Sequence, residues 1–195
     1  MNMSEAIYDE LKSSLLAGRL NLPELIQESN VAEQFGVSKT PAREALNRLV
    51  DQGILVKYSR KGYVLKKLSD KQFIDLQILR CRVLCSFADD MISKNTDEEL
   101  SEFSRLVTDY GSYEQERIGL NSYFYIKLAE LTKNEWVVSV TELLLMYFFG
   151  CSHPVYQFHS TAIDDTKAGH HRIIKALLAR DAQALRAALE SDIIR

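Results

Sequence analysis

The stretch VAEQFGVSKTPAREALNRLVDQGIL, Val31 to Leu55, decides the fold of the N-terminal part of the chain. Apolar residues at helical spacing predict two helices, over 28–35 and 39–52. Between them Gly36 suits a tight turn, because glycine adopts positive φ without strain. Ser38 is the expected N-cap of the second helix, and Pro41 lies in its first turn, where proline is tolerated. Two helices joined in this way predict a helix-turn-helix.

The flanking segments complete a winged form of this motif. Upstream, apolar spacing predicts a helix over 4–16. Downstream, Gly53 ends the second helix, and residues 54–58 and 63–65 predict two short strands around the turn Ser59–Gly62. The order helix, helix, turn, helix, basic hairpin is that of a winged helix-turn-helix, which binds DNA.

The N-terminal turn of the second helix carries the candidate DNA contacts. A recognition helix enters the major groove with this turn foremost, so its donors and cations are the candidates: Ser38, Lys39, Thr40 and Arg43. Arg43 is the expected base reader, because a guanidinium matches O6 and N7 of guanine. Lys39 and Thr40 suit phosphate contacts or a second base contact. For Glu44, a partner within the domain and a solvated acid are equally open interpretations.

The hairpin tip offers a second set of candidate contacts. Arg60 and Lys61 next to Gly62 would place two cations along the DNA backbone or in the minor groove. The alternative is an exposed tip whose cations have no such role. Charge favours the DNA interpretation: residues 38–67 hold eight basic and two acidic side chains, although the whole chain has a net charge of −3.

From residue 69 onward helical patterns continue to the end, with expected helices over 70–92, 97–115, 119–132, 134–150, 163–179 and 181–193. The predicted fold class is therefore mainly α. Residues 1–68 form a winged helix-turn-helix of three helices plus a β-hairpin wing, and residues 69–195 form an all-α helical bundle for ligand binding and dimerisation.

Composition limits the class of protein. Hydrophobic residues make up 46% of the chain, and no apolar run approaches the roughly 18 residues of a membrane span. The N-terminal MNMSEAIYDELK has no apolar signal core. Three cysteines, an odd number, argue against a disulfide framework. We therefore expect a cytoplasmic protein.

Residues 6–66 resemble the DNA-binding domain of the GntR family of bacterial regulators. FGVSKTPAREAL (35–46) is close to the family hallmark, and GILVKYSRKGYVL (53–65) resembles its wing. One departure is Lys39, where the family usually has arginine. Lysine keeps the charge but loses the bidentate geometry. Another departure is Pro23-Glu24, where Pro-Gly is usual.

The helical remainder resembles the FCD ligand domain of the fatty-acid-regulator branch of that family. The resemblance rests on residues 76–80, on NSYFYIKLAELTKN (121–134) and on HHRIIKALLARDAQALRAAL (170–189). It implies four ligands for a divalent metal, which in turn holds a small carboxylate. This chain has Asn121 where Asp is expected, Tyr125 where His is expected, His170 as expected, and Asp192 near the position of the last His. Asn and Tyr are poor transition-metal ligands, so we expect no metal cofactor.

The same positions can form a polar, metal-free cavity for the effector. The candidate effector-binding residues are Arg80, Asn121, Tyr125, His170 and Asp192, with Arg80 pairing with a ligand carboxylate. Each of them is at least as well interpreted as an internally satisfied polar group or a surface side chain, and Asp192 lies where the chain end is expected to fray.

Other conspicuous side chains have plainer interpretations. Cys81 and Cys85, one helical turn apart, are expected to be two buried cysteines rather than a redox or metal pair. The remaining histidines are expected to be surface or structural residues: His153, His159 and His171. Trp136 and the run Tyr147–Phe149 are expected to lie in the core or in a dimer interface.

The leading hypothesis is a homodimeric transcription regulator that binds an inverted-repeat operator on double-stranded DNA under the control of a small-molecule effector. The alternative is a ligand-independent regulator whose C-terminal domain only dimerises. An enzyme is not expected, because the chain lacks a phosphate-binding glycine loop, a nucleophile elbow and a full metal constellation. The sequence leaves open the effector, the operator, and whether the effector releases or promotes DNA binding.

Overall fold

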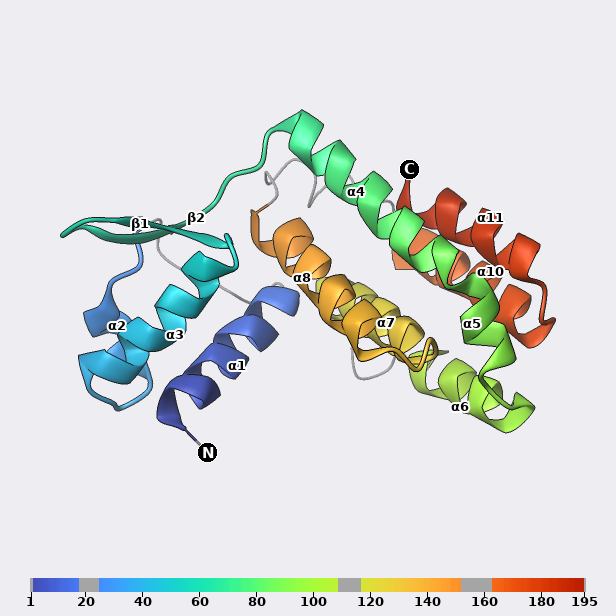
Figure 1. Cartoon of the computed structure of the whole chain (residues 1–195), viewed down its shortest axis with the longest axis horizontal. Coiled ribbons are helices and arrows are strands. Elements are labelled where there is room, and N and C mark those ends of the chain that lie inside the picture. Colours follow the sequence, from blue (N-terminus) through green and yellow to red (C-terminus); the bar gives the residue numbers. More distant parts are fainter. Residues whose placement is uncertain (1, 18–24, 109–116, 152–162, 195) are drawn as a thin grey trace.

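The computed structural model describes residues 2–17, 25–108, 117–151 and 163–194. Figure 1 shows the helices and the β-hairpin in two neighbouring groups, with long helices running from the junction to the far end of the molecule. The fold is mainly α with one two-stranded sheet, as predicted. In chain order the elements are α1 (Met3–Leu16), α2 (Glu28–Gln34), α3 (Lys39–Asp51), β1 (Leu55–Tyr58), β2 (Gly62–Leu65), α4 (Asp70–Ser86), α5 (Ala88–Ser93), α6 (Asp97–Thr108), α7 (Arg117–Glu130), α8 (Glu135–Cys151), α10 (Ile163–Leu178) and α11 (Ala182–Ile193).

The first group packs α1 and α2 against α3. Gly36, with φ 63°, makes the turn between α2 and α3, and Ser38, with an extended backbone, occupies the N-cap position of α3. The apolar face of α3 is fully buried, which fixes the opposite, polar face toward solvent. The buried residues of α3 are Ala42, Ala45, Leu46 and Leu49.

The hairpin is antiparallel, with Leu55 opposite Leu65 and Tyr58 opposite Gly62. Tyr63 on β2 also exchanges two backbone hydrogen bonds with Ile26, at 2.7 and 2.9 Å. The segment that leads into α2 is thereby joined to the hairpin. Both Tyr63 and Ile26 are only 1% exposed, so the start of β2 belongs to the core of this group.

The second group, α4 to α11, encloses a separate apolar core to which most of its helices contribute. The expected single helix over 70–92 was wrong, since the chain leaves helical geometry at Phe87 (φ −105°, ψ 13°) and resumes as α5. At this point the Ser86 hydroxyl donates to the Val83 carbonyl at 2.7 Å, a local bond that competes with the helical ladder. The break places Ala88 and Met91 on the buried side.

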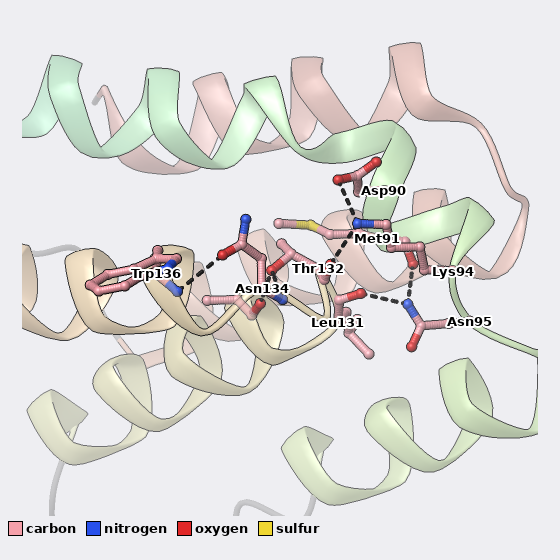
Figure 2. Close-up of polar contacts among 9 residues, drawn as sticks. Asp90, Met91, Lys94, Asn95, Leu131, Thr132, Asn134 and Trp136 are labelled. Atoms are coloured by element: carbon pink, nitrogen blue, oxygen red, sulfur yellow. Dashed lines mark hydrogen bonds and ion pairs between the residues drawn. The ribbon is translucent and has the colours of Figure 1, made fainter.

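The corner between α5 and α6 is joined to the turn between α7 and α8 by polar contacts (Figure 2). Asn95, 4% exposed, donates through Nδ2 to the carbonyls of Met91 at 2.8 Å and Leu131 at 2.6 Å. Lys94 donates to the Thr132 carbonyl at 3.3 Å from the same side. In the turn, Asn134 caps α8 by accepting from the Trp136 amide at 3.0 Å. Carbonyls left unpaired at helix ends are thus satisfied by side chains.

Helix α8 contributes to both cores. Leu145 and Phe149 lie in the core of the second group, whereas Met146 and Cys151 lie in the core of the first. In Figure 1, α1 lies beside α8 at the junction. Because the two groups share a buried helix, they are mechanically coupled.

Polar contacts reinforce this junction. The Tyr147 hydroxyl donates to the Gln52 carbonyl at 2.7 Å, directly after the last residue of α3. Lys12 on α1 pairs with Glu142 on α8 at 2.6 Å. Gly53, with φ 74°, has no room for a larger residue, since an added Cβ would lie 2.4 Å from the Tyr147 hydroxyl oxygen.

No helix within the described ranges is both long enough and apolar enough to cross a membrane.

Candidate DNA-binding surface and effector site

The N-terminal turn of α3 is a polar, solvent-exposed helix end. Ser38, Lys39 and Thr40 are all exposed. Ser38 makes no side-chain capping bond, so its hydroxyl does not hydrogen-bond to the amides at the start of the helix. Backbone amides at a helix N-terminus attract anions, and Lys39 adds a positive charge beside them. The predicted phosphate-binding and base-contacting groups therefore point away from the core.

Arg43, the predicted base reader, lies on the same surface in a bidentate ion pair with Glu28. Its Nε is 2.9 Å from each carboxylate oxygen, and its Nη2 is 2.8 Å from Oε2. The Arg43 side chain nevertheless remains 53% exposed. Glu44, the acid considered as a partner within the domain, is exposed. The sequence reasoning did not single out Glu28, although it supplies the acid that contacts Arg43.

Glu28 also accepts a hydrogen bond from the hydroxyl of Tyr63, at 2.9 Å from Oε1. The hydrogen bond from Arg43 lowers the pKa of Glu28, so its carboxylate stays ionised at neutral pH. Burial, with a further contribution from Glu28, raises the pKa of Tyr63 to about 12, so the phenol remains a donor. One carboxylate thus links α2, the recognition helix and the hairpin.

The hairpin tip carries the other predicted DNA contacts. Arg60 and Lys61 are exposed, and Arg60 has positive φ (60°) within the turn. Gly62, with φ 131°, passes close to the chain before α2, and an added Cβ would lie 2.4 Å from the Ile26 carbonyl oxygen. A cleft of about 280 Å³ separates the hairpin from α2 and the start of α3, and its cationic lining residues are Lys39, Lys57, Arg60 and Lys61. This cleft has the charge and position expected for a DNA backbone.

In the second group, the five predicted effector-binding residues come together from four helices. The Tyr125 hydroxyl on α7 donates to Asp192 on α11 at 2.5 Å. His170 Nε2 on α10 lies 3.1 Å from the Asn121 side-chain oxygen on α7. The guanidinium carbon of Arg80 on α4 lies 4.7 Å from the centre of the Tyr125 ring. Asp192, expected to fray, is instead held by this hydrogen bond in the last turn of α11.

Arg80 is buried and forms no salt bridge among the described residues, although the charge of Asp192 favours its protonated form. It is 2% exposed, lies between the rings of Tyr125 and Phe148, and its Nε and Nη1 have no hydrogen-bond partner within the described part of the chain. Burial lowers the pKa of Arg80 from its usual value. A buried charge of this kind is costly unless another group compensates it.

His170 is also fully buried. Its ring stacks on Phe124 with centroids 3.7 Å apart. Burial, with smaller contributions from His171 and Arg80, lowers the pKa of His170 to about 3, so the imidazole is neutral at pH 7. Its Nδ1 has no partner among the described residues, so it is a further buried polar atom in this region without a hydrogen bond.

The residues present are a poor fit for the divalent metal that the family resemblance implies. Within the described ranges, no group of three or more His, Cys, Asp or Glu side chains is placed to hold a metal ion. Tyr125 and Asp192 are bonded to each other, and His170 Nε2 is bonded to Asn121. A neutral phenol and an amide oxygen are weak substitutes for imidazole and carboxylate ligands.

The sequence also singled out two cysteines on one helix, Trp136 and the remaining histidines. Cys81 and Cys85 have sulfurs 3.8 Å apart, and burial raises the pKa of both thiols, so they are poor nucleophiles. Cys85 is only partly buried. Trp136, expected in the core or an interface, is 73% exposed in the described structure. His171 is exposed, and His153 and His159 lie outside the described residues.

Comparison with known families supports both parts of this description. Residues 3–65 match the family model of bacterial regulatory proteins of the gntR family, and residues 76–194 match that of the FCD domain. The second match covers more than half of the chain.

Among curated relatives, the HTH-type transcriptional regulator McbR of Escherichia coli is 23% identical over 95% of this chain and 87% of its own length. The Bacillus subtilis HTH-type regulator YdhC is 28% identical over 69% of this chain, and the Nta operon transcriptional regulator of Aminobacter aminovorans is 31% identical over 57%. The matched parts span 63% and 55% of the lengths of these last two relatives.

Solved structures show the same fold. The structure of E. coli McbR/YncC aligns with a TM-score of 0.86 at 21% identity, covering 99% of this chain and 94% of that one. A putative GntR regulator from Rhodococcus sp. RHA1 aligns with a TM-score of 0.76 at 17% identity, over the same shares of the two chains. The chain therefore belongs to the gntR family of bacterial transcription regulators and has a C-terminal FCD domain.

Proposed function

We propose that the chain acts as a homodimer on an inverted-repeat operator, and that its FCD domain binds a small carboxylate effector through Arg80 without a metal. DNA contacts come from the exposed start of α3, Ser38, Lys39, Thr40 and Arg43, and from Arg60, Lys61 and Gly62 at the hairpin tip. The effector contacts come from Arg80, Asn121, Tyr125, His170 and Asp192.

The observation that carries the effector proposal is the buried guanidinium of Arg80, whose charge Asp192 compensates only in part. Its Nε and Nη1 are buried without a partner among the described residues. An arginine in this state gains most from a carboxylate, which accepts two parallel charge-assisted hydrogen bonds. The neutral His170 and the Tyr125 hydroxyl offer polar contacts for the remainder of a small ligand. The binding free energy then offsets the cost of keeping the charge buried.

The absence of a metal is part of the proposal and rests on the side-chain chemistry. Of the four positions implied by the resemblance, His170 alone keeps its ligand type, and its Nε2 faces an amide oxygen. Elemental analysis of untagged protein, purified without chelators, tests this point. About one transition metal per chain, lost in His170→Ala, would contradict it.

Dimerisation follows from the geometry of DNA recognition. One winged helix contacts a half-site, and linking two of them raises the effective concentration of the second contact. The outer face of α4 supports a self-association surface, since Ile74 and Leu79 are 53% and 50% exposed there. Sedimentation of the full chain at micromolar concentration should show a dimer, and a monomer that binds its operator tightly would exclude this arrangement.

The effector proposal is tested by thermal unfolding with a panel of small mono-, di- and tricarboxylates. A bound ligand at 100 times its Kd contributes about 2.7 kcal/mol, which corresponds to a rise in Tm of about 5–10 °C for a chain of this size. Arg80→Gln should abolish the rise, whereas Arg82→Gln, on the exposed side of the same helix, should retain it. Failure of every carboxylate to shift the wild-type Tm would favour the ligand-independent regulator.

A further inference from the structure

The ion pair between Glu28 and Arg43 occupies one particular edge of the guanidinium. The carboxylate contacts Nε and Nη2, with distances of 2.8–2.9 Å. The other edge, formed by Nη1 and the second N–H of Nη2, is not used in this pair. That edge presents two parallel donors, the arrangement that matches O6 and N7 of guanine.

Glu28 is itself held from the opposite side. Tyr63, buried on β2 next to the hairpin turn, donates its hydroxyl hydrogen to Oε1 of Glu28 at 2.9 Å. The Glu28 side chain is only 21% exposed, compared with 53% for that of Arg43. The carboxylate is therefore the fixed member of the pair, and the arginine is the member that extends toward solvent.

The same cluster includes the next turn of the recognition helix. The Asn47 side-chain oxygen lies 3.1 Å from Lys57 Nζ on β1 and 3.3 Å from the Tyr63 hydroxyl oxygen. The orientation of the hairpin and that of α3 are thus coupled through polar side chains close to Arg43.

We propose that Glu28 is a positioning residue for sequence readout, which aims the free edge of Arg43 at a base, and that Tyr63 holds Glu28 in place. This inference rests on the proposed readout by Arg43. An arginine without such a partner has many rotamers, and fixing one of them before binding reduces the entropy lost on DNA contact.

Two plainer roles for the pair make different predictions. As a surface salt bridge, it would contribute about 0–1 kcal/mol to folding and nothing to base selectivity. If Glu28 instead competed with DNA for the Arg43 guanidinium, removal of its carboxylate would strengthen DNA binding with no loss of base selectivity. As a positioning residue, its removal lowers selectivity at one base pair per half-site, while affinity for random DNA stays equal or rises because an acid near the phosphates is gone.

The test is in vitro selection from a random double-stranded DNA library at fixed salt, using the full-length chain and four variants. Arg43→Ala should reduce the preference at one base pair per half-site by about 5- to 150-fold, the range expected for one bidentate contact. Glu28→Gln keeps the side-chain size but loses the second acceptor oxygen, and should reduce the preference at the same base pair at least about fivefold. Tyr63→Phe should give a smaller loss at that position. Glu33→Gln removes an equal charge from an exposed position on the same helix and should leave the motif unchanged.

The outcomes separate this inference from the function on which it rests. If the wild-type chain enriches no motif, the proposed operator binding fails. If Arg43→Ala loses one base pair and neither Glu28→Gln nor Tyr63→Phe does so, the positioning role is wrong and the operator binding stands. Uniform loss across the motif in Glu28→Gln, or the same local loss in Glu33→Gln, would also overturn it. Should Glu28→Gln fail to fold by circular dichroism, Tyr63→Phe carries the test, because it leaves the ion pair intact.

Discussion

His170 should make the stability of this protein depend on pH in a predictable direction. Burial lowers its pKa from 6.5 to about 3, so the folded chain keeps the imidazole neutral throughout the mildly acidic range. The unfolded chain exposes the imidazole, which takes up a proton below pH 6.5. Proton uptake by the unfolded state alone favours unfolding. The contribution of His170 is therefore fully present above pH 6.5 and is lost as the pH falls from 6.5 toward 3.

The size of the effect follows from the two pKa values. At pH 7.5 the imidazole is neutral in both states, and the loss is close to zero. At pH 5.5 the unfolded imidazole is about tenfold more protonated than neutral, which corresponds to a loss of about 1.4 kcal/mol in the free energy of unfolding. The loss grows by about 1.4 kcal/mol for each further pH unit until the folded pKa is reached.

Urea unfolding at pH 7.5 and 5.5 measures this loss when the wild type is compared with His170→Gln. Glutamine keeps a nitrogen donor near Asn121 but does not titrate, so the difference between the two proteins isolates the imidazole from all carboxylates. His171→Gln is a second comparison: it removes an exposed histidine at the adjacent position, which makes only a smaller contribution to the lowered pKa of His170, so most of the pH dependence should remain. Parallel stabilities of wild type and His170→Gln, within about 0.3 kcal/mol over this pH range, would refute the buried neutral imidazole.

Three further changes test the packing and the polar contacts. Asn95→Ala removes two buried hydrogen bonds and leaves two carbonyls unpaired, so we expect a loss of about 2–3 kcal/mol in urea unfolding, whereas Asn30→Ala at an exposed site should cost under about 0.5 kcal/mol. Gly53→Ala meets both a positive φ and the Tyr147 hydroxyl, so it should lower stability by more than about 1 kcal/mol. In a double-mutant cycle, Tyr147→Phe should recover part of the Gly53→Ala loss by removing the oxygen that the new methyl group meets.

The fold of the N-terminal group was predictable because its signals are local. Gly36 and Ser38 stand where a turn and a cap are needed, and the apolar spacing around them leaves one helical face to be buried. The break at Phe87 was not predictable, since the apolar pattern continues through it and residues 70–92 contain neither proline nor glycine. Trp136, expected in the core or in a dimer interface, lies outside the core for a related reason. In a helix as apolar as α8, periodicity does not indicate which face remains in solvent.

In the candidate sites too, some residues could be predicted from the neighbouring sequence, whereas the contacts of others depend on how distant helices pack. The exposed cations at the start of α3 follow from the capping pattern alone. Glu28 has no local signal for its contact, because Arg43 lies 15 residues away on another helix. The clustering of Arg80 with Asp192 depends on how α4, α7 and α11 pack, and it was inferred through the family resemblance rather than from spacing. Asp192 escapes the expected fraying because Tyr125 donates to it from a buried helix.

Helix α8 connects the two sites through adjacent residues. The ring of Phe148 lies 5.0 Å from the guanidinium carbon of Arg80, and the preceding residue, Tyr147, donates to the Gln52 carbonyl at the end of the recognition helix. A ligand that changes the position of Arg80 therefore acts on a helix whose next side chain is bonded to the DNA-reading motif. Met146 and Cys151, buried in the N-terminal core, prevent α8 from moving without that core. An effector alters operator affinity only by binding one arrangement of this shared helix better than another. The packing supplies such a connection without any contact between effector and DNA.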